Sequence, residues 1–133
     1  MTAVSELTTD EIDDIANRLL AAIASGDSEG VRACYSSDAR MWHNFDELEQ
    51  DVEQNLSTLS DMHHRASNLD YTEIRRFPAP GGFVQQHVLV ADAKYGPLRM
   101  PAVIRFWVED GRITRLEEYL DTRQARVLYK PVG

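Results

Sequence analysis

Apolar residues in the first part of the chain repeat at helical spacing. Thr8 followed by Glu11 forms the pattern of a capping box, and Gly26 ends the segment. Between them apolar side chains recur every three or four positions, at Ile12, Ile15, Ala16, Leu19, Leu20 and Ile23. Asp27 is placed to cap a second, shorter helix with Val31, Cys34 and Tyr35 on its inner face. The sequence thus predicts a helical hairpin.

The period of the pattern then changes. Residues 39–44 read as a short strand, and Asp46 is predicted to cap a third helix whose apolar side is Leu48, Val52, Leu56, Leu59 and Met62. Four β-rich runs follow, at residues 68–77, 83–91, 98–108 and 113–121. Short connections rich in Gly and Pro separate them, and Asp110-Gly111 suits a type I′ turn. Residues 122–133 are either a short helix over the sheet or a frayed end.

Helices gathered first and strands afterwards indicate an α+β fold, since alternating βαβ units would give a doubly wound sheet. At 133 residues, 43% hydrophobic and 27% charged, the chain suits one globular domain spanning residues 1–133. Residues 1–10 contain no basic and apolar leader pattern, so we expect a cytoplasmic protein. Cys34 is the single cysteine, and its place in an apolar stripe predicts a buried, inert thiol.

The charge of the chain narrows the choice of partners. The formal net charge is −8, and no basic stripe with interleaved aromatic residues is present, so nucleic acid is not expected as a partner. No apolar run is long enough for a membrane span. His63 and His64 are adjacent, which does not match the i, i+4 spacing of a helical zinc site, so no metal and no cofactor are expected.

Polar residues interrupt the apolar alternation in three predicted strands. Trp42 and Asn44 share one face of the first strand, either as pocket wall and hydrogen-bonding group or as a core aromatic and a strand end. Gln85 and His87 share one face of another strand. This face is either exposed to solvent or lines a site. Glu118 lies in the last run beside Glu117, and their side chains point to opposite faces.

The order of these elements, with the segments 33–39, 41–44 and 111–121, resembles the nuclear transport factor 2-like superfamily and, more narrowly, its SnoaL-like and limonene-epoxide-hydrolase-like branches. The resemblance covers nearly the whole chain. It implies a cone-shaped, cystatin-like α+β fold, in which N-terminal helices pack on a strongly curved antiparallel sheet that encloses a pocket.

The resemblance also implies site residues. Alignment to the epoxide hydrolase pattern puts Trp42 at a tyrosine, Asn44 at an asparagine, Gln85 at an arginine, and His87 and Glu118 at two aspartates. Because the charged Asp-Arg-Asp set is absent, epoxide opening is not expected, and His87 with Glu118 is the candidate acid–base pair. The same alignment turns these residues inward and predicts further pocket-lining side chains, namely Met100, Ala102, Ile104, Phe106 and Leu120.

Two functions follow from this interpretation. The first is a small-molecule enzyme of isomerase, cyclase, dehydratase or hydrolase type that uses non-covalent acid–base chemistry on a hydrophobic substrate. The second is a ligand-binding or accessory protein with the same pocket and no turnover. The opposite face of the sheet carries the apolar Val103 beside the aromatic Trp107 and Tyr119, and this set predicts a homodimer through the outer sheet face.

Overall fold

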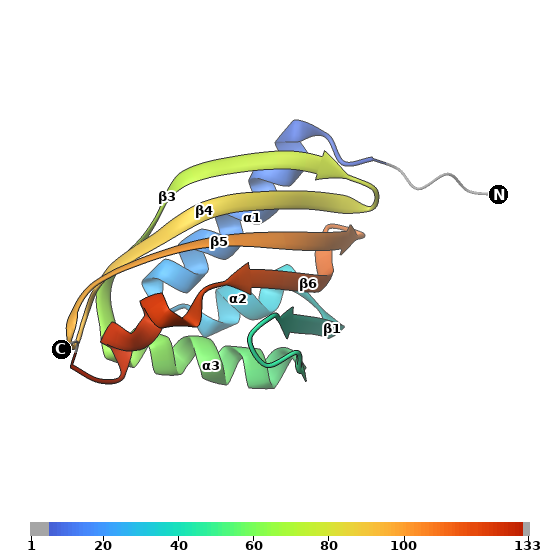
Figure 1. The fold of residues 1–133 in the computed structure, drawn as a ribbon. Helices are drawn as coiled ribbons and strands as arrows, with labels where there is room; N and C mark the ends of the chain where they lie inside the picture. The colour runs from blue at the N-terminus through green and yellow to red at the C-terminus, as the bar shows by residue number, and fades with distance from the viewer. Residues whose placement is uncertain (1–5, 132–133) are drawn as a thin grey trace.

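The computed structural model describes residues 6–131. Three α-helices lie against one face of a curved six-stranded sheet, and a 3-10 helix follows the last strand (Figure 1). The strand order is β2-β1-β6-β5-β4-β3, and the sheet does not close on itself. This arrangement confirms the predicted α+β fold with helices packed on a strongly curved sheet.

The first helix starts and stops at the residues that the sequence predicts. The second starts at its predicted cap but ends at Cys34, because Tyr35, predicted to lie on this helix, is extended and begins the first strand. Helix α1 (Thr9–Ser25) begins with a reciprocal capping box between Thr8 and Glu11 and ends at Gly26, which adopts a left-handed φ of 73°. In α2 (Ser28–Cys34) the Asp27 side chain accepts a hydrogen bond from the Gly30 amide. Cys34 is buried in the core, as expected.

The third helix begins later than the sequence predicts. Helix α3 (Val52–Arg65) is capped by Asp51, which forms a capping box with Gln54. Asp46 instead accepts a hydrogen bond from the Leu48 amide two residues on, and this local turn competes with helix formation. Leu48 is 64% exposed and precedes the two-residue strand β2 (Glu49–Gln50), so its predicted place on the helix is wrong.

The five longer strands overlap the predicted runs and mostly extend beyond them, whereas β1 and β6 each end one residue earlier than predicted. They are β1 (Tyr35–His43), β3 (Ala66–Ala79), β4 (Gly82–Ala93), β5 (Gly96–Glu109) and β6 (Arg112–Leu120). Strands β3 to β6 form an antiparallel meander, and Asp110 and Gly111 both have positive φ at the last hairpin, as a type I′ turn requires. Strand β1 starts at Tyr35 and lies parallel to β6, a pairing that the long connection through α3 and β3 to β5 permits.

The core lies between the inner face of the sheet and the helices. Phe83 and Phe106 stack at its centre with ring centroids 4.6 Å apart. A second buried cluster is formed around Leu89, Met100 and Leu128. Leu128 belongs to the 3-10 helix η1 (Thr122–Leu128), so the tail after β6 is a short helix packed on the sheet.

Candidate functional site

The largest cavity lies between the concave face of the sheet, α1, α3 and η1. Its volume is about 390 Å³ and its wall is mainly apolar, with Leu20 from α1, Met62 from α3 and Leu116 from β6. The exposed aromatic residues Phe45 and Tyr129 stand at its rim. A pocket of this kind suits a small hydrophobic molecule that one or a few polar groups orient.

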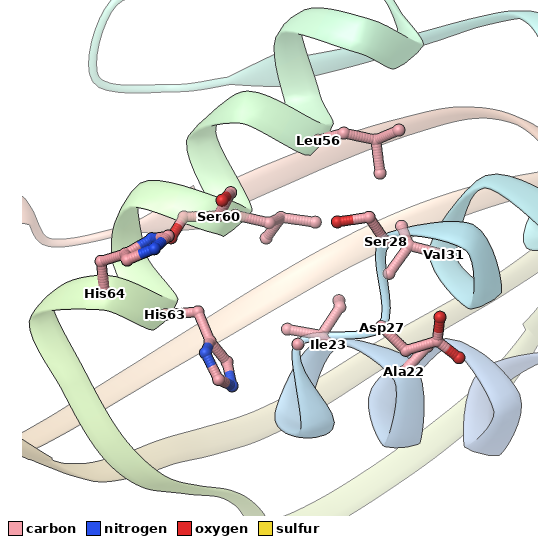
Figure 2. Close-up of a pocket in the computed structure, with 11 residues that line it drawn as sticks. Ala22, Ile23, Asp27, Ser28, Val31, Leu56, Ser60, His63 and His64 are labelled. Carbon is pink, nitrogen blue, oxygen red and sulfur yellow. The ribbon is translucent and has the colours of Figure 1, made fainter.

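A second, smaller cavity of about 90 Å³ lies between the α1–α2 junction and α3 (Figure 2). His63 packs against Gly26, where an added Cβ would come within 2.8 Å of the imidazole ring. The His64 ring bonds back to its own helix, because Nδ1 lies 2.7 Å from the Ser60 carbonyl oxygen. Within residues 6–131 no group of three or more His, Cys, Asp or Glu side chains could hold a metal ion.

One polar group of the large cavity is a histidine–carboxylate pair. His43 and Glu118 are register partners in the parallel strands β1 and β6, which places their side chains on the same face. His43 Nε2 lies 3.1 Å from Glu118 Oε1, and the two side chains are only 12% and 18% exposed. A carboxylate held this way keeps one oxygen on the imidazole and can present the other to a ligand.

The other polar group is His87 on β4, which is 4% exposed. Its Nδ1 lies 2.8 Å from Gln85 Nε2, and Gln85 Oε1 accepts a hydrogen bond of 2.9 Å from Arg76 Nε. Burial lowers the pKa of His87, Glu118 acts in the opposite direction, and the positive charge of Arg76 adds to the lowering. His87 is therefore a neutral imidazole at neutral pH.

The buried Tyr35 and the partly buried Tyr71 complete the polar lining. Tyr71 lies edge-on to the His87 ring at a centroid distance of 4.9 Å, and Tyr35 donates a hydrogen bond of 2.9 Å to Asn55 Oδ1. Burial raises the pKa of both phenols, with a further contribution from the negative charge of Glu118. Both hydroxyls therefore remain protonated, and the Tyr35 hydroxyl donates its hydrogen to Asn55.

Half of the predicted site residues line this cavity. Both members of the proposed acid–base pair do so, together with three of the predicted apolar residues, and the set is His87, Glu118, Met100, Ile104 and Leu120. His87 and Glu118 lie on strands β4 and β6, with β5 between them. The Glu118 carboxylate contacts His43, and not its predicted partner His87.

The remaining predicted residues lie elsewhere. Trp42 packs on Tyr119, with ring centroids 5.4 Å apart, and Asn44 Oδ1 accepts a hydrogen bond from the Leu120 amide. Gln85 is fully buried behind His87. Ala102 and Phe106 are also buried without lining the large cavity, Phe106 because it stacks on Phe83 in the core.

The strand β1 shows why Trp42 and Asn44 do not reach the cavity. Ala39 and Met41 are fully buried and His43 lines the cavity, so odd-numbered residues point inward there. The sequence carried this signal, because Ala39 and Met41 are apolar and share the period of His43. The predicted site instead followed the family alignment, which puts Asn44 in the pocket, and for this reason it did not include His43.

Comparisons with known proteins agree with this fold. The family model described as "SnoaL-like domain" matches residues 16–116. PrhC from Penicillium brasilianum NBRC 6234 has a similar structure, with a TM-score of 0.78 and 15% identity over 90% of this chain and 85% of that chain. A protein of Shewanella denitrificans OS-217, provisionally assigned as a SnoaL-like polyketide cyclase, has a TM-score of 0.76 and 12% identity over 90% of this chain and 96% of that chain.

A limonene-epoxide-hydrolase-like epoxide hydrolase of M. tuberculosis has a TM-score of 0.71 and 20% identity, covering 90% of both chains. Identities this low establish a shared fold and leave the reaction open. A comparison with curated protein sequences finds no match.

Proposed function

Because the chain belongs to the SnoaL-like domain family, we propose that residues 1–133 act as one domain that performs non-covalent acid–base chemistry on a hydrophobic small molecule. The reaction is of the isomerase, cyclase, dehydratase or hydrolase type. Glu118 and His87 are the catalytic residues, and the apolar wall that includes Met100, Ile104 and Leu120 binds the substrate.

The observation that carries this proposal is the Glu118 carboxylate inside an apolar cavity, 3.1 Å from His43 Nε2 and in the same cavity as His87. A carboxylate that lines the same cavity as the substrate can accept a proton directly from a bound carbon or oxygen acid. A neutral imidazole elsewhere on the wall can stabilise the charge that develops on the substrate. Proton abstraction and its stabilisation thus come from separate side chains.

The experiment is hydrogen–deuterium exchange at the acidic α-carbon of 2-tetralone, a bicyclic ketone of suitable size, followed by ¹H NMR in D₂O. The wild-type protein should accelerate the exchange, and Glu118→Gln should remove the acceleration, because the amide cannot accept the proton. The matched control is Glu73→Gln, which makes the same change at an exposed glutamate paired with Arg99. Equal exchange with and without wild-type protein would reject proton abstraction from ketones at this site.

The alternative function is ligand binding without turnover. A specific observation supports it: the hydrogen bonds of His87 with Gln85 and of His43 with Glu118 also satisfy these polar groups structurally. A ligand that co-purifies in the cavity and is recovered unchanged after prolonged incubation would favour this alternative.

We also propose a homodimer through the outer face of the sheet. On this face Tyr119 is 51% exposed and packs beside Trp42, and the Arg105 guanidinium lies 4.2 Å from the centre of the Trp107 ring. Together with Val103, these side chains form a surface rich in aromatic rings that suits a twofold contact.

Nucleic acid and membranes are not expected as partners, and a cytoplasmic location remains part of this proposal. Within the described residues, no helix combines the length and apolarity needed to cross a membrane.

A further inference from the structure

A chain of polar contacts leads from α1 to His87. The Arg76 guanidinium donates hydrogen bonds of 2.9 Å to Asp13 Oδ1, to Asn17 Oδ1 and to Gln85 Oε1. Its side chain is only 13% exposed, and the contacts hold it between the helix and the sheet. Arg76 is therefore fixed at one end by α1 and presents a donor to Gln85 at the other.

Arg76 decides how the Gln85 amide is oriented. A guanidinium has donors and no acceptor, so the atom of Gln85 that faces Arg76 must be the carbonyl oxygen. The amide nitrogen then faces His87, where it lies 2.8 Å from Nδ1. Gln85 is fully buried, so no water competes for either end of the amide.

The orientation of Gln85 in turn decides the tautomer of His87. An amide NH₂ group only donates, so Nδ1 of His87 must be the unprotonated, accepting nitrogen. The neutral ring consequently carries its hydrogen on Nε2. Within residues 6–131 the structure gives Nε2 no hydrogen-bond acceptor, and the ring lines the large cavity.

We propose that Arg76 and Gln85 are positioning residues that hold His87 as a neutral Nε2–H donor, so that the cavity selects apolar ligands carrying an acceptor oxygen of the carbonyl type. His87 would then stabilise negative charge on that oxygen while Glu118 receives the proton. The ligand part of this inference rests on the proposed function, whereas the tautomer part does not depend on turnover.

The charged and titratable groups near His87 are consistent with this state. Burial and the Arg76 charge lower the pKa of the imidazole, and Glu118 opposes them. Tyr71 packs edge-on against the ring and stays neutral, because burial raises the pKa of its phenol. A second proton on Nδ1 would meet the Gln85 amide hydrogens, so protonation also requires that hydrogen bond to break.

The tautomer is tested by long-range ¹H–¹⁵N NMR of the full chain labelled with ¹⁵N-histidine, at about pH 7.5. The expected spectrum shows a pyridine-type Nδ1 and a pyrrole-type Nε2 for His87. Gln85→Glu replaces the donor with a carboxylate, and it should convert Nδ1 into a protonated donor and raise the pKa of His87. A wild-type spectrum with a protonated Nδ1 would overturn the inference.

A second variant covers the case in which Gln85→Glu does not fold. Arg76→Gln removes the fixed donor and lets the Gln85 amide rotate, so His87 should show a mixture of tautomers. Arg75→Gln is the matched control, since it changes the adjacent, exposed arginine of β3, and it should leave the His87 spectrum unchanged. If Arg76→Gln leaves one Nε2–H tautomer, Arg76 is not a positioning residue.

The ligand class is tested by titrating the wild-type protein with 2-tetralone and with tetralin, which has the same ring system without oxygen. The ketone should bind roughly three- to tenfold more tightly, which is the range expected for one neutral hydrogen bond. It should also shift the His87 Nε2–H resonance. Equal affinities would overturn the ligand assignment, while absent α-exchange beside a clear preference for the ketone would count against the proposed function alone.

Discussion

The neutral state of buried His87 makes the stability of the fold depend on pH. Its pKa is lowered in the folded protein, first by burial, so the unfolded chain binds a proton more readily than the native one. Stability is therefore fully present above the usual histidine pKa of about 6.5 and falls as the pH drops toward the folded pKa. If the native imidazole stays neutral, going from about pH 7.5 to about pH 5.5 lowers the free energy of unfolding by about 1.4 kcal/mol through this group alone.

Urea denaturation of the wild type and of His87→Gln over this pH range measures the effect. Carboxylates and the other histidines titrate in both proteins, so the difference between the two pH slopes isolates His87. The absolute stability of the variant does not enter, because only its dependence on pH is compared. Parallel curves for the two proteins would refute the claim that folding holds His87 neutral.

Further predictions concern the cavity, the sheet and the core. Burial lowers the pKa of His87 and Glu118 partly offsets this, so NMR titration of Glu118→Gln should show a lower His87 pKa than wild type. Trp107→Glu should convert a micromolar dimer into a monomer in sedimentation experiments, because it places an unpaired carboxylate in the proposed interface; a wild-type monomer at all concentrations would contradict the dimer. Phe106→Ala should lower the free energy of unfolding by about 3–5 kcal/mol, and Phe77→Ala, at a residue 50% exposed, by far less in the same denaturation assay.

Most of the fold could be predicted from the sequence because its elements carry local signals. The capping box of Thr8 and Glu11, the glycine at position 26 and the Asp110-Gly111 turn each specify a backbone conformation within a few residues. The third helix was misplaced because Asp46 and Asp51 both have capping side chains. The capping box to Gln54 distinguishes them, and this pattern was present in the sequence.

The candidate site was predicted less completely, since it depends on which strands lie side by side. The alternation of β4 correctly puts Gln85 and His87 on one face, yet it cannot show that Arg76 of β3 reaches Gln85. Arg76 and Gln85 are register partners, and two irregularities in the β3–β4 pairing set that register. The alternation of side chains along a single strand does not reveal such a shift in register between two strands.

The pairing of His43 with Glu118 has a consequence for the choice of catalytic base. The two residues meet because β1 and β6 run parallel, although the chain between them spans the whole meander. His87 is hydrogen-bonded to Gln85 through Nδ1, and His43 contacts Glu118 through Nε2. Each histidine thus has one nitrogen in a defined contact, which supports the proposal that the Glu118 carboxylate is the group that accepts the proton. In the proposed reaction the substrate therefore gives its proton to Glu118, and His87 stabilises the negative charge left on the substrate.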